Sequence, residues 1–147
     1  MKVTNKTIEI KTKGEYDCID ITDQVIEIIK KSKIKKGLVN VQSMHTTAVV
    51  VINENEPLLI EDIKNHLEEL SSKNKDYNHD NFEIRTVNMC DDECANGHAH
   101  CKAILLSAMA TLNLLNGELQ LGEWQRILFW ELDRSRNRKI QVHILGE

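Results

Sequence analysis

The sequence predicts a single α+β domain, spanning residues 1–147, in which helices pack against an antiparallel or mixed β-sheet. Three observations predict this class. Segments with alternating polar and apolar residues occur throughout the chain, a few segments of helical period lie among them, and turn residues join neighbouring segments over short distances. The length of 147 residues suits one domain with a sizeable core.

Composition narrows the class of protein. With 41% hydrophobic and 29% charged residues, the chain has the make-up of a folded domain, and its net charge of −4 gives no electrostatic case for nucleic acid. No run approaches the ~20 apolar residues of a membrane span, so we expect a cytoplasmic protein without a membrane partner. Four cysteines are too few for a disulfide scaffold, and we expect them to be reduced.

The N-terminal segment is expected to form a strand and a helix. Residues 7–11 alternate between polar and apolar side chains, as a half-buried strand does. Thr22 and Asp23 offer an N-cap for a helix over residues 24–33, and Gly37 is expected to end that segment.

Two strands and a second helix are expected next. Residues 38–43 read as a strand, and the apolar, β-branched run 48–52 predicts a central strand buried on both faces. Residues 53–57 form a turn, and Pro57 suits the first position of the helix that follows. The apolar stripe of that helix consists of Leu59, Ile63, Leu67 and Leu70.

The second half of the chain is expected to hold a buried helix among strands. Residues 82–88 alternate like a strand, and residues 99–115 are apolar nearly all round, which predicts a buried helix. Asn116-Gly117 signals a tight turn. Residues 119–133 then predict a long strand, with residues 139–145 as its antiparallel partner.

The stretch from Asn88 to Lys102 is the densest in groups that bind metals or move protons. It holds three of the four cysteines and two of the six histidines. His98 and His100 lie where the expected buried helix begins. Unpaired N–H groups and the positive dipole end at such a helix start favour a bound anion.

The cysteines of this stretch predict neither a zinc cluster nor a nucleophile. Cys90, Cys94 and Cys101 lack the paired spacing of structural zinc sites. Cys101 follows His100 directly, and adjacent helical residues diverge by about 100°, so the two do not form a thiolate–imidazole pair. A small buried thiol is the simpler interpretation of Cys101.

The histidines leave two interpretations open. His98 and His100 share a face only where the backbone is extended, and a distant third ligand such as His45 would leave open metal positions, as in a catalytic site. For His45 alone, a hydrogen-bonded core histidine is the simpler alternative. His79 belongs to a site only if its polar loop folds inward.

Two carboxylates on the long strand also leave alternatives. Glu131 and Asp133 share a strand face with apolar residues, so a carboxylate there requires a cation. That cation is either a metal ion or, in a structural salt bridge, Arg136 or Arg138.

Three ordered blocks together resemble the YjbQ-like family, whose members show a secondary thiamine-phosphate synthase activity. The blocks are residues 45–54, residues 96–103, and residues 116–126 continuing through 131–133 and 136–138. The resemblance implies an α+β fold assembled as a homotrimer. Trp124 and Trp130, expected on one strand face, would anchor that assembly.

The resemblance further implies a transferase that acts on phosphorylated small molecules. The reaction joins hydroxymethylpyrimidine diphosphate to a thiazole phosphate and releases pyrophosphate. A divalent metal ion, zinc first, would be held by His45 and His100, with His98 in place of a histidine found in relatives. The implied catalytic residues are His45, Thr46, Thr47 and Glu131, and the implied phosphate-binding residues are Asn96, Lys102, Arg126 and Arg136.

Two other functions fit the same histidines. One is metal-assisted hydrolysis of a different substrate, and the other is non-enzymatic binding of a metal or small anion. Turnover that disappears with His100→Ala would separate the enzymes from the binding protein.

Overall fold

Two antiparallel β-sheets, three α-helices and a short 3-10 turn make up the structure, a computed structural model that describes residues 1–147. The strands are β1 Lys2–Lys11, β2 Cys18–Asp20, β3 Gly37–Ser43, β4 Ala48–Asn53, β5 Met109–Leu115, β6 Glu118–Leu119, β7 Arg126–Glu131 and β8 Asn137–Gly146. The helices are α1 Thr22–Ser32, α2 Pro57–Leu70 and α3 Gly97–Leu105, and the 3-10 turn is η1 Asn78–Asp80. The expected α+β class is confirmed. None of the helices has the length and apolar character needed to span a membrane.

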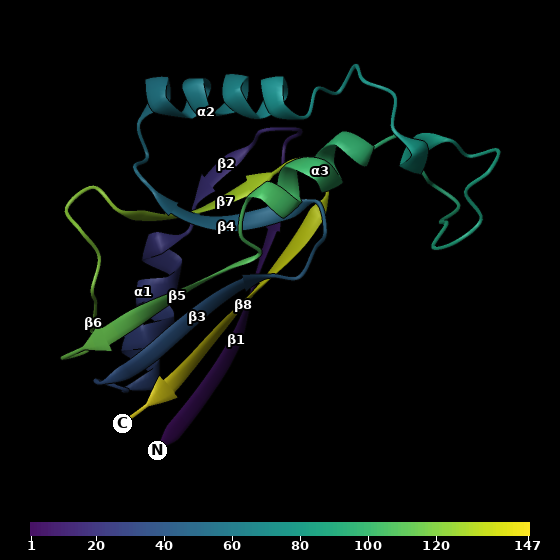
Figure 1. Cartoon of the computed structure of the whole chain (residues 1–147). Helices are drawn as coiled ribbons and strands as arrows, with labels where there is room; N and C mark the ends of the chain where they lie inside the picture. The colour runs from purple at the N-terminus through teal and green to yellow at the C-terminus, as the bar shows by residue number, and fades with distance from the viewer.

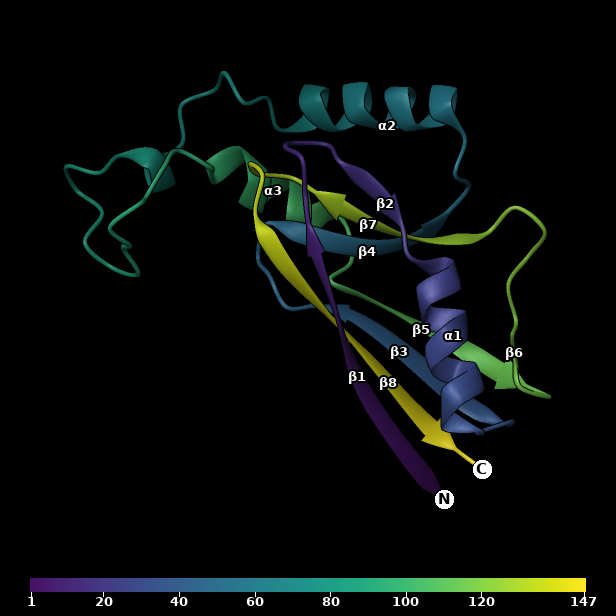
Figure 2. The ribbon, with the colours of Figure 1, turned by 180° about the vertical axis from the view of Figure 1, so that it is seen from behind.

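The two sheets lie in successive layers. The larger sheet has the order β1-β8-β3-β5-β6 and the smaller one the order β2-β7-β4. In Figure 1 the smaller sheet lies between the larger sheet and α2. Helix α1 covers one face of the larger sheet, as the view from behind shows (Figure 2), and its other face carries no helix. Both termini lie at the same end, where Lys2 pairs with Gly146.

The main core fills the space between the two sheets and α1. Residue alternation on β7 explains the layering, because Ile127 and Phe129 face this core while Leu128 and Trp130 face the opposite side. The main core comprises Ile8, Ile21, Val25, Ile29, Ile34, Val39, Val41, Ala48, Val50, Leu114, Ile127, Phe129, Ile140, Val142 and Ile144.

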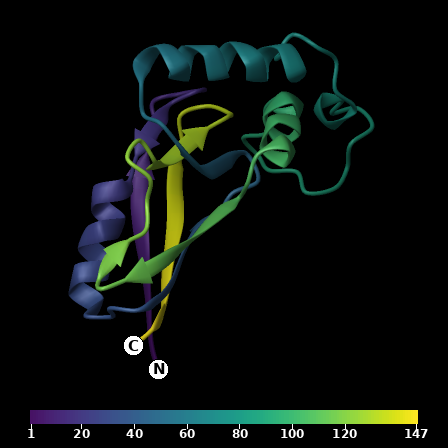
Figure 3. The same ribbon diagram turned by 60° about the vertical axis from the view of Figure 1, so that its left-hand side comes forward.

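A second, smaller core lies on the outer face of the three-stranded sheet, under α2 and α3. Its buried members are Val49, Leu67, Ala99, Leu128, Trp130 and Leu132. Figure 3 shows α2 running across this sheet while the shorter α3 lies beside it. Strand β7 is therefore buried on both faces.

Several expected elements are confirmed. Pro57 stands at the start of α2, where the Glu56 side chain accepts hydrogen bonds from two backbone N–H groups. Asn116 and Gly117 both have positive φ, 56° and 82°, and form the tight turn between β5 and β6.

The expected buried helix over residues 99–115 is wrong. Helix α3 ends at Leu105, and Met109 begins strand β5. Backbone partners from other strands explain the break. The carbonyl of Ser107 accepts the N–H of Val50 in β4 at 3.1 Å, and the carbonyl of Ala108 accepts the N–H of Ser43 in β3 at 2.8 Å. Strand β5 then completes its bonds with β3.

The pairing of the C-terminal strands also differs from the expectation. Residues 119–133 split into β6 and β7, and β8 pairs with β1 and β3 rather than with β7. The run 48–52 lies in β4, an edge strand of the smaller sheet rather than a central one. The strand expected over residues 82–88 is wrong, because residues 82–84 form a turn and residues 85–88 belong to no strand.

The ends of α1 are set by residues other than those expected. The helix begins at Thr22 without a side-chain N-cap, and the Thr22 N–H donates to Asp20 Oδ1 at 3.0 Å. Lys33, with a φ of 59°, ends the helix in the left-handed conformation. Gly37 instead begins β3, where a Cβ would lie 2.0 Å from the carbonyl oxygen of Leu145.

Candidate functional site

A buried ion pair joins β7 to β8. Glu131 is fully buried and accepts hydrogen bonds from Arg138 Nε at 2.6 Å, from Arg138 Nη2 and from Thr12 Oγ1 at 2.9 Å. Arg138 Nη2 also donates to Thr47 Oγ1 at 3.0 Å. Of the two alternatives for this carboxylate, the structure shows the salt bridge, with Arg138 as the partner.

His45 lies beside this ion pair as a hydrogen-bonded histidine. Its Nε2 accepts the backbone N–H of Lys139 at 2.8 Å. Burial, followed by the charge of Arg138, lowers the pKa of His45 below its ordinary value. The imidazole is therefore neutral at pH 7 and its Nε2 lone pair is already used. The neighbouring Thr46 is exposed.

A second buried cluster surrounds Lys102, whose side chain is completely inaccessible to solvent. Its Nζ lies 3.1 Å from Glu15 Oε1, 2.8 Å from Glu68 Oε2 and 4.6 Å from the ring centroid of Tyr16. Burial alone would raise the pKa of Glu68, but hydrogen bonds from Lys102 and Tyr16 outweigh it and bring the pKa to about 2. We call Glu15, Tyr16, Glu68 and Lys102 the Lys102 cluster.

His98 lies against the Lys102 cluster without joining its hydrogen bonds. Its Nε2 is 3.2 Å from Glu15 Oε1, but the two groups are not aligned for a hydrogen bond, and this nitrogen is buried without a partner. Burial lowers the pKa of His98, so a neutral imidazole stands beside a carboxylate.

Asp133 is the centre of a third group. Its Oδ2 accepts hydrogen bonds from Arg136 Nε at 2.9 Å and from Asn96 Nδ2 at 3.4 Å, while Asn96 Oδ1 is buried without a partner.

His100 packs edge-on against His79, with ring centroids 4.6 Å apart. Burial, with the neighbouring His79, lowers the pKa of His100. The polar loop thus does fold inward and brings His79 to α3.

The first N–H groups of α3 are occupied by the protein itself. Asp80 Oδ1 accepts the N–H of Asn96 at 2.9 Å and that of Gly97 at 2.8 Å. Gly97 permits the close packing of this segment, since a Cβ there would lie 2.5 Å from Tyr77 Cβ and 3.2 Å from Asp80 Oδ2. The expected anion site at the helix start is therefore filled by a carboxylate.

The residues expected to bind phosphate are not brought together as one set. Lys102 belongs to its own cluster, and Arg136 is bound to Asp133. Arg126 lies at the other end of β7, with its guanidinium on Asp20 at 2.7 Å and Asp23 at 3.1 Å. Each of these cations already has a carboxylate partner.

The expected metal ligands do not converge either. No group of three or more His, Cys, Asp or Glu side chains in the chain is arranged to hold a metal ion. His45, His98 and His100 therefore form no ligand set within one chain. All four cysteines are free, as expected, but Cys101 is exposed rather than buried.

Unpartnered buried polar atoms concentrate at one end of the molecule. Of six such side-chain atoms, four belong to the start of α3 and the segments against it. They are His79 Nε2, Asn96 Oδ1, His98 Nε2 and Arg134 Nη1. Buried groups of this kind are rare in folded proteins and mark places where a bound molecule or water supplies the missing partner.

Comparison with known proteins places the chain in a family. The family model described as UPF0047 protein YjbQ-like matches residues 6–147. The chain belongs to the YjbQ-like UPF0047 family. A UPF0047 protein from Methanothermobacter thermautotrophicus is 36% identical over 147 residues, which is 100% of this chain and 95% of that protein.

Solved structures show the same YjbQ-like fold. A YbjQ-like protein of unknown function from Sulfolobus solfataricus has a TM-score of 0.85 and 38% identity, with 99% of both chains covered. A hypothetical protein from Aeropyrum pernix has a TM-score of 0.81 and 32% identity over 100% of both chains. The family resemblance found in the sequence is thus confirmed.

The expected function is wrong. The descriptions of the family and of these relatives name no thiamine-phosphate synthase activity and no metal, and one relative is described as being of unknown function. The chain itself shows no assembled metal site. The two metal-dependent alternatives, hydrolysis and metal binding, likewise have no assembled metal site in this chain to support them.

Sequence reasoning missed several residues of these clusters. Glu15 and Tyr16 come from the β1–β2 connection, Glu68 from α2, and Asp80 from the polar loop. None belongs to a local motif, so no short-range signal pointed to them. Their role depends on chain segments that meet only in the folded protein.

Proposed function

We propose that this YjbQ-like protein is an enzyme that performs general acid–base catalysis on a small polar substrate. The site is the polar centre at the start of α3, formed by His79, Asn96, His100 and Asp133, whereas His98 of the same helix lies against Glu15. The observation that carries the proposal is the concentration of unpartnered buried polar atoms there. Buried polar atoms without a partner in the chain are free to form hydrogen bonds with a bound substrate.

His100 has the protonation state that proton abstraction requires. The pKa of His100 is lowered, chiefly by burial, so its ring is neutral at pH 7 and able to accept a proton. The negative charge of Asp133 acts to raise the pKa of His100, so it stabilises the ring once it is protonated. Arg136 fixes that carboxylate at 2.9 Å.

Metabolite profiling tests this proposal without a known substrate. The protein is incubated with a small-molecule extract of cells, and the change in composition is followed by mass spectrometry. We expect the wild type to deplete at least one metabolite, and His100→Gln and Asp133→Asn to abolish the change while retaining the native circular dichroism spectrum. Glu118→Gln, on the exposed strand β6, is the matched control.

Two outcomes would overturn the proposal. One is an unchanged extract with the wild-type protein. The other is depletion that persists in both variants of the polar centre, since the reacting groups would then lie elsewhere.

We further propose that the chain assembles as a homotrimer through the open face of the larger sheet. This face exposes the large apolar side chains Val3, Leu38, Met109, Leu115 and Leu145. By strand register, Leu145 lies next to both Val3 and Leu38, which makes one continuous apolar row. Exposed apolar patches of this kind mark protein interfaces.

The centre of the open face lacks formal charge apart from one histidine. Asn40 pairs with His143 and Thr111, and Gln42 pairs with Gln141 and Met109. Depletion of charged residues is typical of the core of an interface. The tryptophans do not serve as the expected anchor pair, because Trp130 is buried under α2 within the chain while Trp124 is exposed.

Sedimentation equilibrium at micromolar concentration tests the assembly. We expect a trimer for the wild type and dissociation for Asn40→Lys, which places a charge in the middle of the face. Gln24→Lys, on the exposed side of α1, is the control and is expected to remain trimeric. A wild-type monomer contradicts the proposal, and so does an Asn40→Lys trimer of unchanged stability.

We also propose that the protein works in the cytoplasm. Its four cysteines are free, and free thiols persist in reducing compartments. Fractionation of cells, with detection of the protein by antibody, checks this location, and recovery in a secreted or membrane fraction would contradict it.

A further inference from the structure

A cavity of about 400 Å³ lies between α2 and the outer face of the three-stranded sheet. Its lining residues are Val51, Asn53, Asp62, Ile63, His66, Leu67, Leu106 and Trp130. None of them belongs to the polar centre. Its size falls within the range of small-molecule sites, and most of its walls are apolar, as in such sites.

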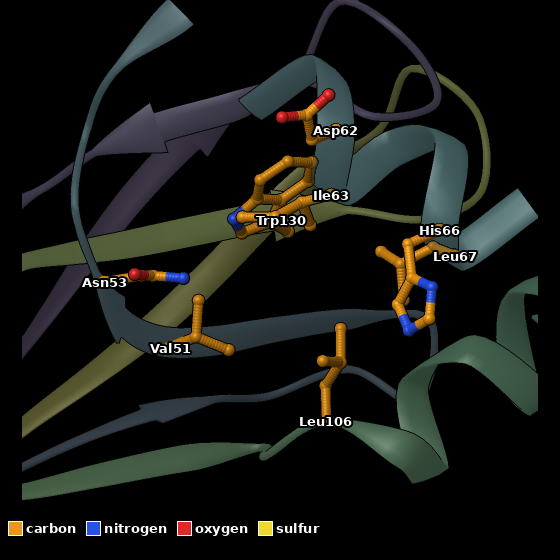
Figure 4. Close-up of a pocket in the computed structure, with 8 residues that line it drawn as sticks. All are labelled: Val51, Asn53, Asp62, Ile63, His66, Leu67, Leu106 and Trp130. Atoms are coloured by element: carbon orange, nitrogen blue, oxygen red, sulfur yellow. The ribbon is translucent and has the colours of Figure 1, made fainter. Parts of the chain in front are cut away.

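The walls of this cavity come from four parts of the chain: β4, α2, the residue after α3, and β7. Figure 4 shows Val51 of β4 and Leu106, which follows α3, pointing toward α2. The Trp130 ring and Ile63 form the opposite side, and His66 reaches down from α2. A hydrophobic ligand would gain free energy by covering these surfaces.

The polar groups at the rim set the charge preference of the cavity. Asp62 is exposed and forms no ion pair. Lys64 pairs with Glu61 at 3.0 Å, and the His66 ring lies 3.9 Å from Glu69. Asn53 Oδ1 accepts the N–H of Glu54 at 2.9 Å, which leaves the amide N–H groups of Asn53 for another acceptor. An unpaired carboxylate at the edge of an apolar cavity attracts a cation and repels an anion.

Trp130 lies behind the cavity lining as part of the outer core, because its side chain is only 1% exposed. Asp62 lies beyond the six-membered ring of that side chain (Figure 4). The charge preference of the cavity therefore rests on the Asp62 carboxylate.

We propose that this cavity binds a protonated organic amine with a hydrophobic body. The body packs against Val51, Ile63 and Leu106, and the ammonium group lies at the Asp62 end. A ligand of this class satisfies both the apolar walls and the unpaired carboxylate. The inference does not rest on catalysis at the polar centre, because the two sites share no residue.

Fluorescence of Trp130 tests the proposal directly. The chain has two tryptophans, so Trp124→Phe leaves Trp130 as the only reporter. The probe is 2-phenylethylamine at pH 8, compared with the neutral 2-phenylethanol. We expect saturable fluorescence changes with both, and an affinity for the amine that is about threefold to fivefold higher, as for an ion pair with an exposed carboxylate.

Two substitutions separate charge from shape. Asp62→Asn is expected to bring the affinity for the amine down to that for the alcohol and to leave the alcohol unchanged. Glu61→Gln, which removes a neighbouring carboxylate already paired with Lys64, is the matched control and is expected to preserve the preference. Both variants alter exposed positions, so folding is retained.

Three outcomes would overturn the inference. They are equal affinities for the amine and the alcohol, a preference that survives Asp62→Asn, and a Trp130 signal that responds to neither probe. The last would show that a second copy of the chain, or α2 itself, covers the cavity in solution.

Discussion

Single side chains decide how charge is buried in this protein. Glu131, Arg138 and Lys102 are almost completely inaccessible, and each is satisfied by partners distant in sequence. The sequence placed Glu131 near a cation, and it offered Arg138 among the alternatives. It did not reveal Glu15 or Glu68, because nothing local connects them with Lys102.

Removing one member of the Glu131 pair should be strongly destabilising. Arg138→Met leaves the Glu131 carboxylate buried without its cation, and such a change costs about 3–5 kcal/mol of unfolding free energy. Lys139→Met, one residue along the chain, breaks only a surface contact with Glu9 at 3.6 Å and should cost less than about 1 kcal/mol.

Urea unfolding of both variants measures the difference. The double variant Glu131→Leu/Arg138→Met should recover much of the loss, because it leaves no unpaired charge. Equal stabilities of Arg138→Met and Lys139→Met would show that the pair is not buried as described.

The acid stability of the protein should depend on Glu68. Its pKa is about 2 in the folded protein, below the ordinary 4.5. Because the folded value is the lower one, its stabilising effect is complete above pH 4.5 and is lost as the pH falls toward 2. The unfolding free energy of the wild type should therefore fall more steeply over this range than that of Glu68→Gln.

Circular dichroism during acid titration in fixed urea measures the two slopes. Glu83→Gln, in an exposed turn, is the control and should follow the wild type. Parallel curves for wild type and Glu68→Gln would contradict the assigned contacts with Lys102 and Tyr16.

Elements differ in how far their own residues determine them. Strand β1, helix α2 and the Asn116-Gly117 turn follow from local pattern and turn chemistry, and all three were expected. The apolar run 99–115 is ambiguous by itself, because continuous apolar residues fit a buried helix and a buried strand equally well. Strands β3 and β4 settle the choice by bonding to the backbone at Ser107 and Ala108.

Glycine at the β5–β6 turn should matter through its backbone conformation alone. Gly117 has a φ of 82°, and a Cβ there would meet no atom within 4 Å. Gly117→Ala should therefore cost about 1 kcal/mol from strain. Gly14→Ala is the matched control, because Gly14 also has open space around it but no positive φ.

Thermal unfolding of the two alanine variants separates strain from crowding. Gly14→Ala is expected to be neutral or slightly stabilising, since it restricts the unfolded chain. Equal effects of the two substitutions would mean that the turn relaxes to a conformation other than the one described.

The whole molecule is set by pairings that no single segment encodes. The last strand, β8, lies between β1 and β3, inside the larger sheet. The sequence showed two strands near the C-terminus and favoured their pairing, because neighbours in sequence usually pair. In the structure the two strands belong to separate sheets instead. Strand β7 lies in the smaller sheet, between the main core and the outer core, so both of its faces are buried.

This layering predicts two levels of local stability. The main core has 15 buried residues, whereas the outer core under α2 and α3 has six. Segments held by fewer buried contacts open at lower free energy than the global unfolding. Helices α2 and α3 should therefore open as a unit while the larger sheet stays folded.

Native-state hydrogen exchange measures this opening residue by residue. Amides of α2 should exchange with a lower opening free energy than those of β3 and β8. Leu67→Ala should lower protection in α2 and α3 selectively, because Leu67 belongs to the outer core. Val41→Ala, in the main core, should lower protection throughout the molecule. Uniform opening free energies in the wild type, or a global effect of Leu67→Ala, would show that the two cores unfold together and that the outer layer contributes to the same cooperative unit as the sheets.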